Sequence, residues 1–322
     1  RVPVGLVIEP IALAALEIHA DAPPTYGRVA AETEAAEQAR VAAERLRQRR
    51  HLATDVRSIT HTDVIEAVTL GETDLFRALH RLPGVSTQDD YTAELWIRGA
   101  PWDQTRVYFD GLPLFHPVHG VGVLSGISTD GIGAALLHPG VQPASLSGGA
   151  AALVIESRPG RRDHAHGLGD LSLASARLAL DGPLPGGEGA WMIAARRSYL
   201  DWLTAVIARL LDNVELATPY AFSDVVARID YRLDEERALG ASRLWSSDRV
   251  TGDVPDLLHG NRARWGNVAA RLTLHAPIAG RRARHSLGVS RYGILIRERT
   301  PDPILEDRFN APQHPPADQS VV

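Results

Sequence analysis

The sequence predicts an α+β domain followed by a sheet of long antiparallel strands, and a change of pattern along the chain is the main reason. Between Glu72 and Arg158, one short helical segment is followed by short apolar runs that glycine-rich turns separate. Past Gly167 the strand-like runs become longer, and the connections between them are alternately short and long. We therefore expect a compact first domain and, after it, about six antiparallel strands.

Length and composition set broad limits. A chain of 322 residues with 44% hydrophobic content suggests roughly two domains with packed cores. The net charge of −5 offers no broad cationic surface, so we expect no nucleic-acid partner. The chain has no cysteine, which excludes disulfides and thiolate chemistry. No apolar run reaches the roughly 18 residues that a transmembrane helix needs, whereas a membrane-spanning strand needs only about 9–11.

A short helix is predicted over residues 73–82 of the first domain. Thr73 can cap its N-terminus, and Asp74 suits the positive end of the helix. Leu75 and Leu79 share one face by their spacing, and a Pro-Gly pair then ends the helix.

Short strands follow this helix. They are expected at Glu94 to Gly99, in a hairpin from Val107 to Leu114, and at Ala134 to His138 and Ala151 to Arg158. The hairpin turns at Asp110-Gly111, a pair that suits a tight turn because glycine tolerates positive φ.

Six longer strands are predicted in the second half of the chain. They cover residues 171–180, 190–197, 222–233, 238–247 and 264–275, and a sixth ends near residue 297. The connections at 198–220 and 248–263 are expected to be long loops, and residues 300–322 to be a third.

Two of these strands alternate cleanly between apolar and polar faces. An arginine that faces lipid in the middle of a bilayer costs about 2–4 kcal/mol, so in a membrane the charged faces would point into a wet lumen. The alternation alone fits a soluble β-sandwich equally well. The apolar faces are Val225, Ala227, Ile229, Tyr231, Leu233 and Gly266, Val268, Ala270, Leu272, Leu274; the polar faces are Asp224, Arg228, Asp230, Arg232 and Asn267, Arg271, Thr273, His275.

Several short motifs occur in a specific order in the first domain. They are Leu82-Pro83-Gly84-Val85, Ile97-Arg98-Gly99, Asp110-Gly111-Leu112-Pro113, Pro139-Gly140, and Val154-Ile155-Glu156 before Arg158. In this order and spacing they resemble the plug domain of TonB-dependent outer-membrane receptors. The resemblance continues at the barrel start, in Ala195 to Asp201, and departs at Leu146 to Ala150, where relatives commonly carry Tyr-Gly-Gly-Arg.

The resemblance implies a membrane β-barrel with an N-terminal α+β plug domain. The expected divisions are residues 1–22, the end of an N-terminal module with a candidate TonB box; 23–55, a helical linker; 56–160, the plug; and 161–322, the first part of the barrel. Plugged transporters use roughly 22 strands, so a chain with about six is expected to be a fragment. The absence of a signal peptide likewise predicts a chain trimmed at its start.

The resemblance also implies a partner. The extended segment Leu16, Glu17, Ile18, His19 and Ala20 is similar to the TonB box, which would bind TonB by strand addition. An ordinary linker strand is the open alternative.

Candidate ligand-binding residues lie in two loops of the plug. The tip after Arg98-Gly99 carries Trp102, Asp103 and Gln104, which combine an aromatic face with polar groups. The segment after the hairpin turn carries Phe115, His116 and His119. The open alternative is that Trp102 only covers the top of the plug.

Four plug residues are expected to be structural. Gly99, Asp110 and Gly111 belong to the turns of the motifs, and the resemblance implies that Arg98 is buried at the contact between plug and barrel and paired with barrel glutamates. A buried guanidinium must be paired, because leaving it alone costs several kcal/mol.

No catalytic residue, metal or cofactor is expected. The pairs His116 and His119, and His164 and His166, each supply only half of a metal site. Ser198 has no nucleophile-elbow sequence around it.

The expected function follows from the resemblance. It is a non-enzymatic receptor in the lipid of a bacterial outer membrane, which binds a small nutrient outside and imports it with energy passed through TonB. Receptors for siderophores, glycans, peptides and cobalamin share this scaffold, so the sequence does not identify the ligand. The alternatives are a non-transporting binding or sensing protein on the same scaffold, and a soluble β-sandwich hydrolase.

Overall fold

The computed structural model describes residues 56–65, 68–69, 72–120, 122–146, 148–172, 175–203, 206, 220–254, 258–278 and 281–297. The chain divides into two units, Arg1–Arg45 and Leu46–Val322, and all described residues belong to the second. The predicted TonB box at Leu16 to Ala20, the helical linker and the tail after residue 300 lie outside the described residues.

A five-stranded sheet forms the centre of the first domain, with the order β1-β10-β11-β6-β7. The pairing is antiparallel throughout except between β11 and β6, which are parallel. All the short apolar runs predicted between residues 107 and 158 are strands of this sheet. Its strands are β1 (Arg57–Thr60), β10 (Ile132–His138), β11 (Ala151–Ser157), β6 (Thr105–Phe109) and β7 (Leu112–Leu114).

Short elements surround this sheet. Three two-stranded ladders are formed by β2 with β3, β4 with β5, and β8 with β9. Their bounds, with those of the helices, are α2 (His61–Ile65), β2 (Val68–Thr69), β3 (Glu72–Thr73), α3 (Leu75–Leu79), β4 (Val85–Ser86), β5 (Trp96–Ile97), η1 (Trp102–Gln104), β8 (Val118–His119), β9 (Leu124–Ser125) and η2 (Thr129–Gly131).

The predicted helix exists but is shorter and starts differently. Thr73 was expected to be its cap, and this is wrong: Thr73 ends β3, and Asp74 is the N-cap of α3. Asp74 Oδ1 accepts hydrogen bonds from the backbone N–H groups of Phe76 and Arg77, because its extended backbone aims the carboxylate at the first turn.

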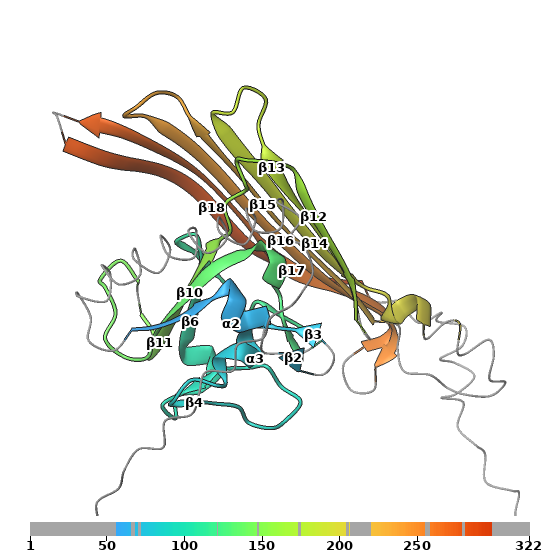
Figure 1. Ribbon diagram of the computed structural model, residues 1–322. Coiled ribbons are helices and arrows are strands. Elements are labelled where there is room, and N and C mark those ends of the chain that lie inside the picture. The colour runs from blue at the N-terminus through green and yellow to red at the C-terminus, as the bar shows by residue number, and fades with distance from the viewer. Residues whose placement is uncertain are drawn as a thin grey trace, which may run out of the picture. The chain divides into compact units, whose positions relative to one another are not determined.

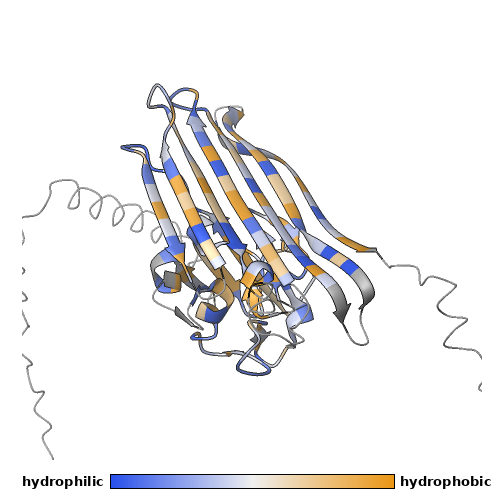
Figure 2. Ribbon diagram, turned by 90° about the vertical axis from the view of Figure 1, so that its right-hand side faces the viewer, coloured by the Kyte–Doolittle hydropathy of each residue, from blue (hydrophilic) through white to orange (hydrophobic). Residues whose placement is uncertain are grey.

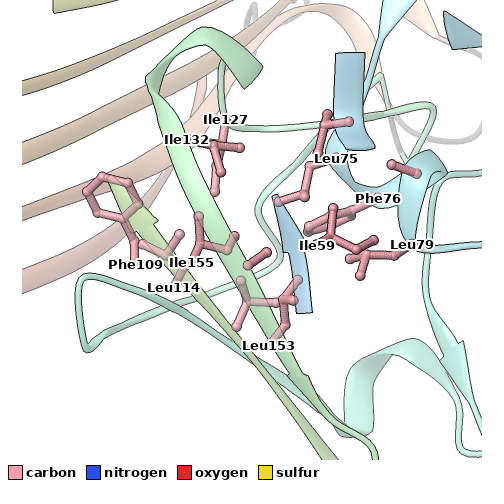
Figure 3. Packing of buried hydrophobic residues seen from close by; sticks show 14 of the residues in the cluster. Ile59, Leu75, Phe76, Leu79, Phe109, Leu114, Ile127, Ile132, Leu153 and Ile155 are labelled. Carbon is pink, nitrogen blue, oxygen red and sulfur yellow. The ribbon is translucent and has the colours of Figure 1, made fainter. Parts of the chain in front are cut away.

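A large apolar cluster fills the first domain and continues to the inward face of the second sheet, and a small second cluster forms around Ala134 and Leu136. Leu75 and Leu79 of α3 are fully buried, as are Leu153 and Ile155 of β11. Phe76 and Leu79 lie beside Ile59 of β1 (Figure 3). The alternation of β11 thus gives the small domain a core against which its helices and loops pack.

The second sheet has seven antiparallel strands in chain order, β12 to β18. We call it the long sheet; it passes over the first domain (Figure 1). Sequence reasoning expected about six strands and missed β12, which is glycine-containing and short. The strands are β12 (His166–Leu171), β13 (Ser175–Pro183), β14 (Gly189–Ser198), β15 (Tyr220–Arg232), β16 (Ala238–Val254), β17 (Leu258–Ile278) and β18 (Arg281–Arg297).

The expected long loop at residues 248–263 is wrong. β16 continues to Val254 and β17 begins at Leu258, and cross-strand pairing extends from Asp248↔Trp265 to Val254↔Leu258. The polar residues of this segment are therefore strand residues, because their backbone groups bond across the pair.

The predicted alternation of the long sheet is confirmed, and hydrophilic and hydrophobic residues alternate along its strands (Figure 2). Ile229, Leu272 and Leu287 point away from the first domain and are exposed. The polar face was expected to line a wet lumen; in the described part of the chain, Asp224 and Asn267 of this face are buried against the first domain, whereas Arg232 and His275 are exposed.

Charge is not confined to the inward face. Arg243 is exposed on the outward face, where it pairs across the strands with Ala227 and Ala270. No helix among the described residues is long and apolar enough to span a membrane.

Candidate functional site

A buried polar cluster joins the first domain to the long sheet, and Arg196 of β14 is at its centre. Its Nε donates to Asp224 Oδ2 at 2.8 Å, and its Nη1 donates to Glu72 Oε1 at 3.2 Å. Its Nη2 donates to the carbonyl oxygen of Ser125, and the guanidinium carbon lies 5.2 Å from the ring centroid of Phe222. The arginine thus binds two segments of the first domain to β15.

His119 of β8 is the second fully buried member of this cluster. Its Nδ1 lies 2.8 Å from Asp248 Oδ2 and its Nε2 lies 3.1 Å from Asp224 Oδ2. The ring stacks on Phe222 at a centroid distance of 4.3 Å. Burial opposes the charge of His119, but the bonds to the two carboxylates outweigh it and raise the pKa of the imidazole above its usual value.

The register of the sheet explains how these side chains meet. Arg196 and Asp224 are direct cross-strand partners, and Asp248 is paired with Phe222, two positions from Asp224 on the same face. On the opposite side, His119 lies between positive-φ residues, His116 and Gly120, which turn its short ladder toward the sheet.

Further polar contacts follow the same face of the sheet toward the turns that join β15 to β16 and β17 to β18. Asn267 Oδ1 accepts from the backbone N–H of Phe115 at 3.0 Å, and Asn267 Nδ2 donates to the Phe115 carbonyl at 2.9 Å. Nearer the turns, Arg271 donates to the carbonyl oxygen of Asp110, and Arg228 donates to the Ser157 carbonyl at 2.9 Å.

Two contacts fix the first domain to β13. Arg177 donates to Thr73 Oγ1 at 2.7 Å and lies 3.3 Å from a carboxylate oxygen of Asp130. Asp181, fully buried, accepts from Arg158 at 3.0 Å. In both contacts, a charged group is paired with one of opposite charge, because an unpaired charge would be costly to bury.

The expected burial of Arg98 is not seen against the described strands, and its pairing with barrel glutamates stays a prediction. Arg98 is exposed in a left-handed turn at φ 52°, with Gly99 at φ 82°, rather than buried against the sheet. The buried arginine of the contact is Arg196, which belongs to the sheet itself. The predicted turn at Asp110-Gly111 is confirmed, and the Asp110 carboxylate accepts from Ser157 N at 2.9 Å.

The structure brings four of the six predicted ligand-binding residues around one hollow of about 110 Å³: Trp102, Asp103, Phe115 and His116. The rings of Trp102 and His116 are 4.3 Å apart, and His116 Nε2 lies 3.2 Å from Glu94 Oε1. That these residues contact a ligand stays a prediction.

The remaining two residues lie elsewhere. Gln104 is exposed outside the hollow, and its carbonyl accepts from Ala150 N at 2.9 Å. His119 is buried in the polar cluster, so its expected place on an open loop is wrong. The histidine pairs also separate: His164 is bonded to Asp163, whereas His166 lies 3.7 Å from Asp181. In the described part of the chain, no group of metal-binding side chains converges.

Sequence reasoning missed Glu72, Arg196 and Asp248 as functional positions. Arg196 lay in a predicted strand, whereas Asp248 fell in an expected loop and Glu72 directly before the predicted helix, so no shared signal marked the three residues. Nothing in the sequence says that Glu72 lies beside Arg196, because 124 residues separate them.

Comparison with known protein families identifies the first domain. Residues 49–154 match the family model "TonB-dependent Receptor Plug Domain". No curated protein matched the sequence.

Three solved structures share the fold at low sequence identity. The outer membrane transporter YddB from Escherichia coli has a TM-score of 0.54 at 10% identity, over 76% of this chain and 39% of that one. The siderophore receptor PirA from Acinetobacter baumannii has a TM-score of 0.52 at 16% identity, over 74% and 40%. The alcaligin outer-membrane receptor FauA from Bordetella pertussis has 0.50 at 17% identity, over 76% and 40%. The chain therefore spans about 40% of the length of these proteins.

Proposed function

From the premise that this chain carries the plug domain and barrel strands of a TonB-dependent receptor of the bacterial outer membrane, we propose that it serves in nutrient uptake. The receptor binds its ligand on the outer side and imports it when energy reaches the plug through TonB. The solved relatives are receptors and transporters, and the cargo and the coupling to TonB belong to this proposal.

The observation that carries the proposal is the polar seat of the plug on the inward face of the sheet. Polar contacts between plug and sheet lie toward both ends of the strands: at Tyr220 and Asp248 toward one end, and toward the other in one cross-strand row that holds Arg271, Arg228 and Asp181. Water can take over each of these contacts when the plug moves, which it cannot do for apolar surfaces. Such a contact suits a plug that closes the barrel at rest and moves when energy is supplied from outside the protein.

The hollow beside Trp102 supports a ligand site on the outer side. In outer-membrane barrels the short turns are periplasmic and the long loops extracellular. The residues 199–219 form the longest connection of the sheet, and Tyr220 follows it directly and contacts Gly120. Phe115 of the hollow packs on Tyr292, away from the short turns.

The size of the hollow bears on the ligand. At about 110 Å³ it is smaller than the roughly 300–1,000 Å³ of complete small-molecule sites, so it would hold one part of a larger ligand. Because PirA is a siderophore receptor, ferric siderophores are the first class to test.

Uptake of ⁵⁵Fe-labelled siderophores by cells that express the full-length receptor tests the proposal. We expect iron to enter cells that contain TonB and to remain outside isogenic cells without it, for at least one catecholate, hydroxamate or carboxylate chelate. We also expect Trp102→Ala to weaken surface binding of that chelate about tenfold or more, since buried aromatic contacts dominate binding energy, and Gln104→Ala to leave it unchanged.

Binding that is equal with and without TonB, and never followed by uptake, would favour a non-transporting receptor instead. If no chelate of the panel is bound or taken up, ferric siderophores are rejected as the ligand class. Cobalamin and oligosaccharides would then be the next probes.

A further inference from the structure

The environment of His119 requires a proton on each ring nitrogen. Nδ1 lies 2.8 Å from Asp248 Oδ2 and Nε2 lies 3.1 Å from Asp224 Oδ2, and both carboxylate oxygens are acceptors. A neutral imidazole has one N–H, so it would set a lone pair against one of these oxygens. Only the imidazolium donates to both aspartates.

The surrounding charges favour the same state. Glu72 of β3, Asp224 of β15 and Asp248 of β16 bring three carboxylates to the cluster, whereas Arg196 of β14 is its permanent cation. Tyr220 donates its hydroxyl hydrogen to Asp248 and is not a source of positive charge. A charged His119 reduces this excess of buried negative charge.

One further carboxylate lies close by but is already satisfied. Asp74 accepts from the backbone and side chain of Ser125 as well as from the first turn of α3. It therefore stabilises the end of the helix and does not compete for the His119 proton.

The proton lies where the plug meets the sheet. His119 belongs to the plug, and both of its partners belong to the sheet, 105 and 129 residues away along the chain. We propose that His119 is a proton-binding clasp, which holds the plug on Asp224 and Asp248 when doubly protonated and loosens it when one proton leaves.

The clasp concerns the seating of the plug and goes beyond uptake. It requires that plug and sheet assemble as described, but no particular ligand and no coupling to TonB. A failed uptake experiment would therefore leave it standing.

The sign of the pH dependence follows from the raised pKa of His119. A released plug would expose a histidine with a pKa of about 6.5. Below that value both states carry the proton, and the clasp contributes fully. Its contribution is lost as the pH rises through the higher pKa of the seated state, and each unit between the two values changes the ratio of seated to released plug by about tenfold.

Two measurements on the full-length receptor in lipid vesicles test the clasp. The first is NMR of selectively ¹⁵N-labelled histidine, with the His119 signals assigned by their loss in His119→Gln. We expect both His119 nitrogens to be protonated at pH 7.5, where an ordinary histidine is neutral. A neutral His119 at pH 7.5 would overturn the proposal.

The second measurement is the urea concentration at which half of the plug is unfolded, detected by tryptophan fluorescence at pH values from 6 to 9. The wild type should lose stability toward alkaline pH, and His119→Gln should be less stable at pH 6 and lack this trend. Asp248→Asn removes one carboxylate and should shift the trend to lower pH while preserving the fold.

His80→Gln is the matched control. His80 is a half-buried plug histidine bonded to the Glu94 carbonyl, away from the sheet, and burial lowers its pKa. Its replacement should leave the alkaline trend intact. A trend that persists in His119→Gln, or that disappears in His80→Gln, would contradict the assignment to His119.

Discussion

Individual charged side chains hold the plug on the sheet beside an apolar cluster that the two parts share. Arg196 shows why this contact is stable: each of its three guanidinium nitrogens donates a hydrogen bond, to Asp224, to Glu72 and to a backbone carbonyl. Removing one partner of such a group costs more than the pair contributes, because it leaves a charge buried alone. The contact is therefore sensitive to single substitutions.

Arg196→Ala should destabilise the seated plug by about 3–5 kcal/mol, since Glu72 and Asp224 would lose their cation inside the contact. The neighbouring Arg197 points outward, is 57% exposed and pairs with Asp201. Arg197→Ala should cost no more than about 1 kcal/mol, as surface pairs contribute little.

Urea unfolding of the full-length receptor in vesicles compares these two variants. Equal shifts would show that Arg196 is no more important than a surface arginine. Restoration by Arg196→Lys to the wild-type midpoint would also contradict the bridging role of Arg196, because lysine cannot bond in three directions as the planar guanidinium does.

At the scale of elements, the close approach of η2 to the long sheet depends on a residue without a side chain. A Cβ added at Gly131 would lie 2.5 Å from Val226 Cβ, closer than side chains come in folded proteins. The short 3₁₀ turn can thus carry Thr129 and Asp130 to Arg177 of β13 only because position 131 is a glycine.

Gly131→Ala should weaken the seating of the plug by about 1–3 kcal/mol, the usual cost of overpacking. In the Gly131→Ala variant, a second substitution, Val226→Gly, should remove most of the destabilisation that the added methyl group causes by overpacking. The effects of the two substitutions on stability should therefore not be additive in a double-mutant cycle. An alanine at Gly169 in β12 would meet no atom within 4 Å and is the control. Additive effects of Gly131→Ala and Val226→Gly would show that the two residues are not in contact.

At the scale of the whole molecule, the long sheet separates two environments. Its inward face carries the charges that meet the plug, and its outward face carries an apolar row across the strands at Trp191, Ile229, Ala241, Leu272 and Leu287. In an outer-membrane barrel this row faces lipid. Arg243 interrupts the outward face one row above it.

Leu272→Arg should destabilise the receptor in lipid vesicles by about 2–4 kcal/mol if its row is near the bilayer centre, because a charge then enters hydrocarbon. Arg243→Leu should have the opposite sign and stabilise the protein. Reversible unfolding from vesicles measures both. If Leu272→Arg were neutral and Arg243→Leu destabilising, the outward face would not be in contact with lipid.

The sequence by itself determined the local elements. Period-two alternation specified the faces of β15 and β17, and the Asp110-Gly111 turn and the apolar runs of β10 and β11 followed from turn chemistry and hydrophobicity. These features depend on neighbours within a few residues, which a single sequence displays. The motifs in family order predicted the plug.

Only the tertiary structure decided which charges meet. Arg98 and Arg196 both directly follow short apolar runs in the sequence, yet one is exposed in a turn and the other fully buried. The same holds for His119, whose two partners are more than a hundred residues away. Pairings over such distances are set by how plug and sheet pack together, and the extension of β16 and β17 to Val254 and Leu258 was likewise decided by cross-strand bonds that polar composition does not reveal.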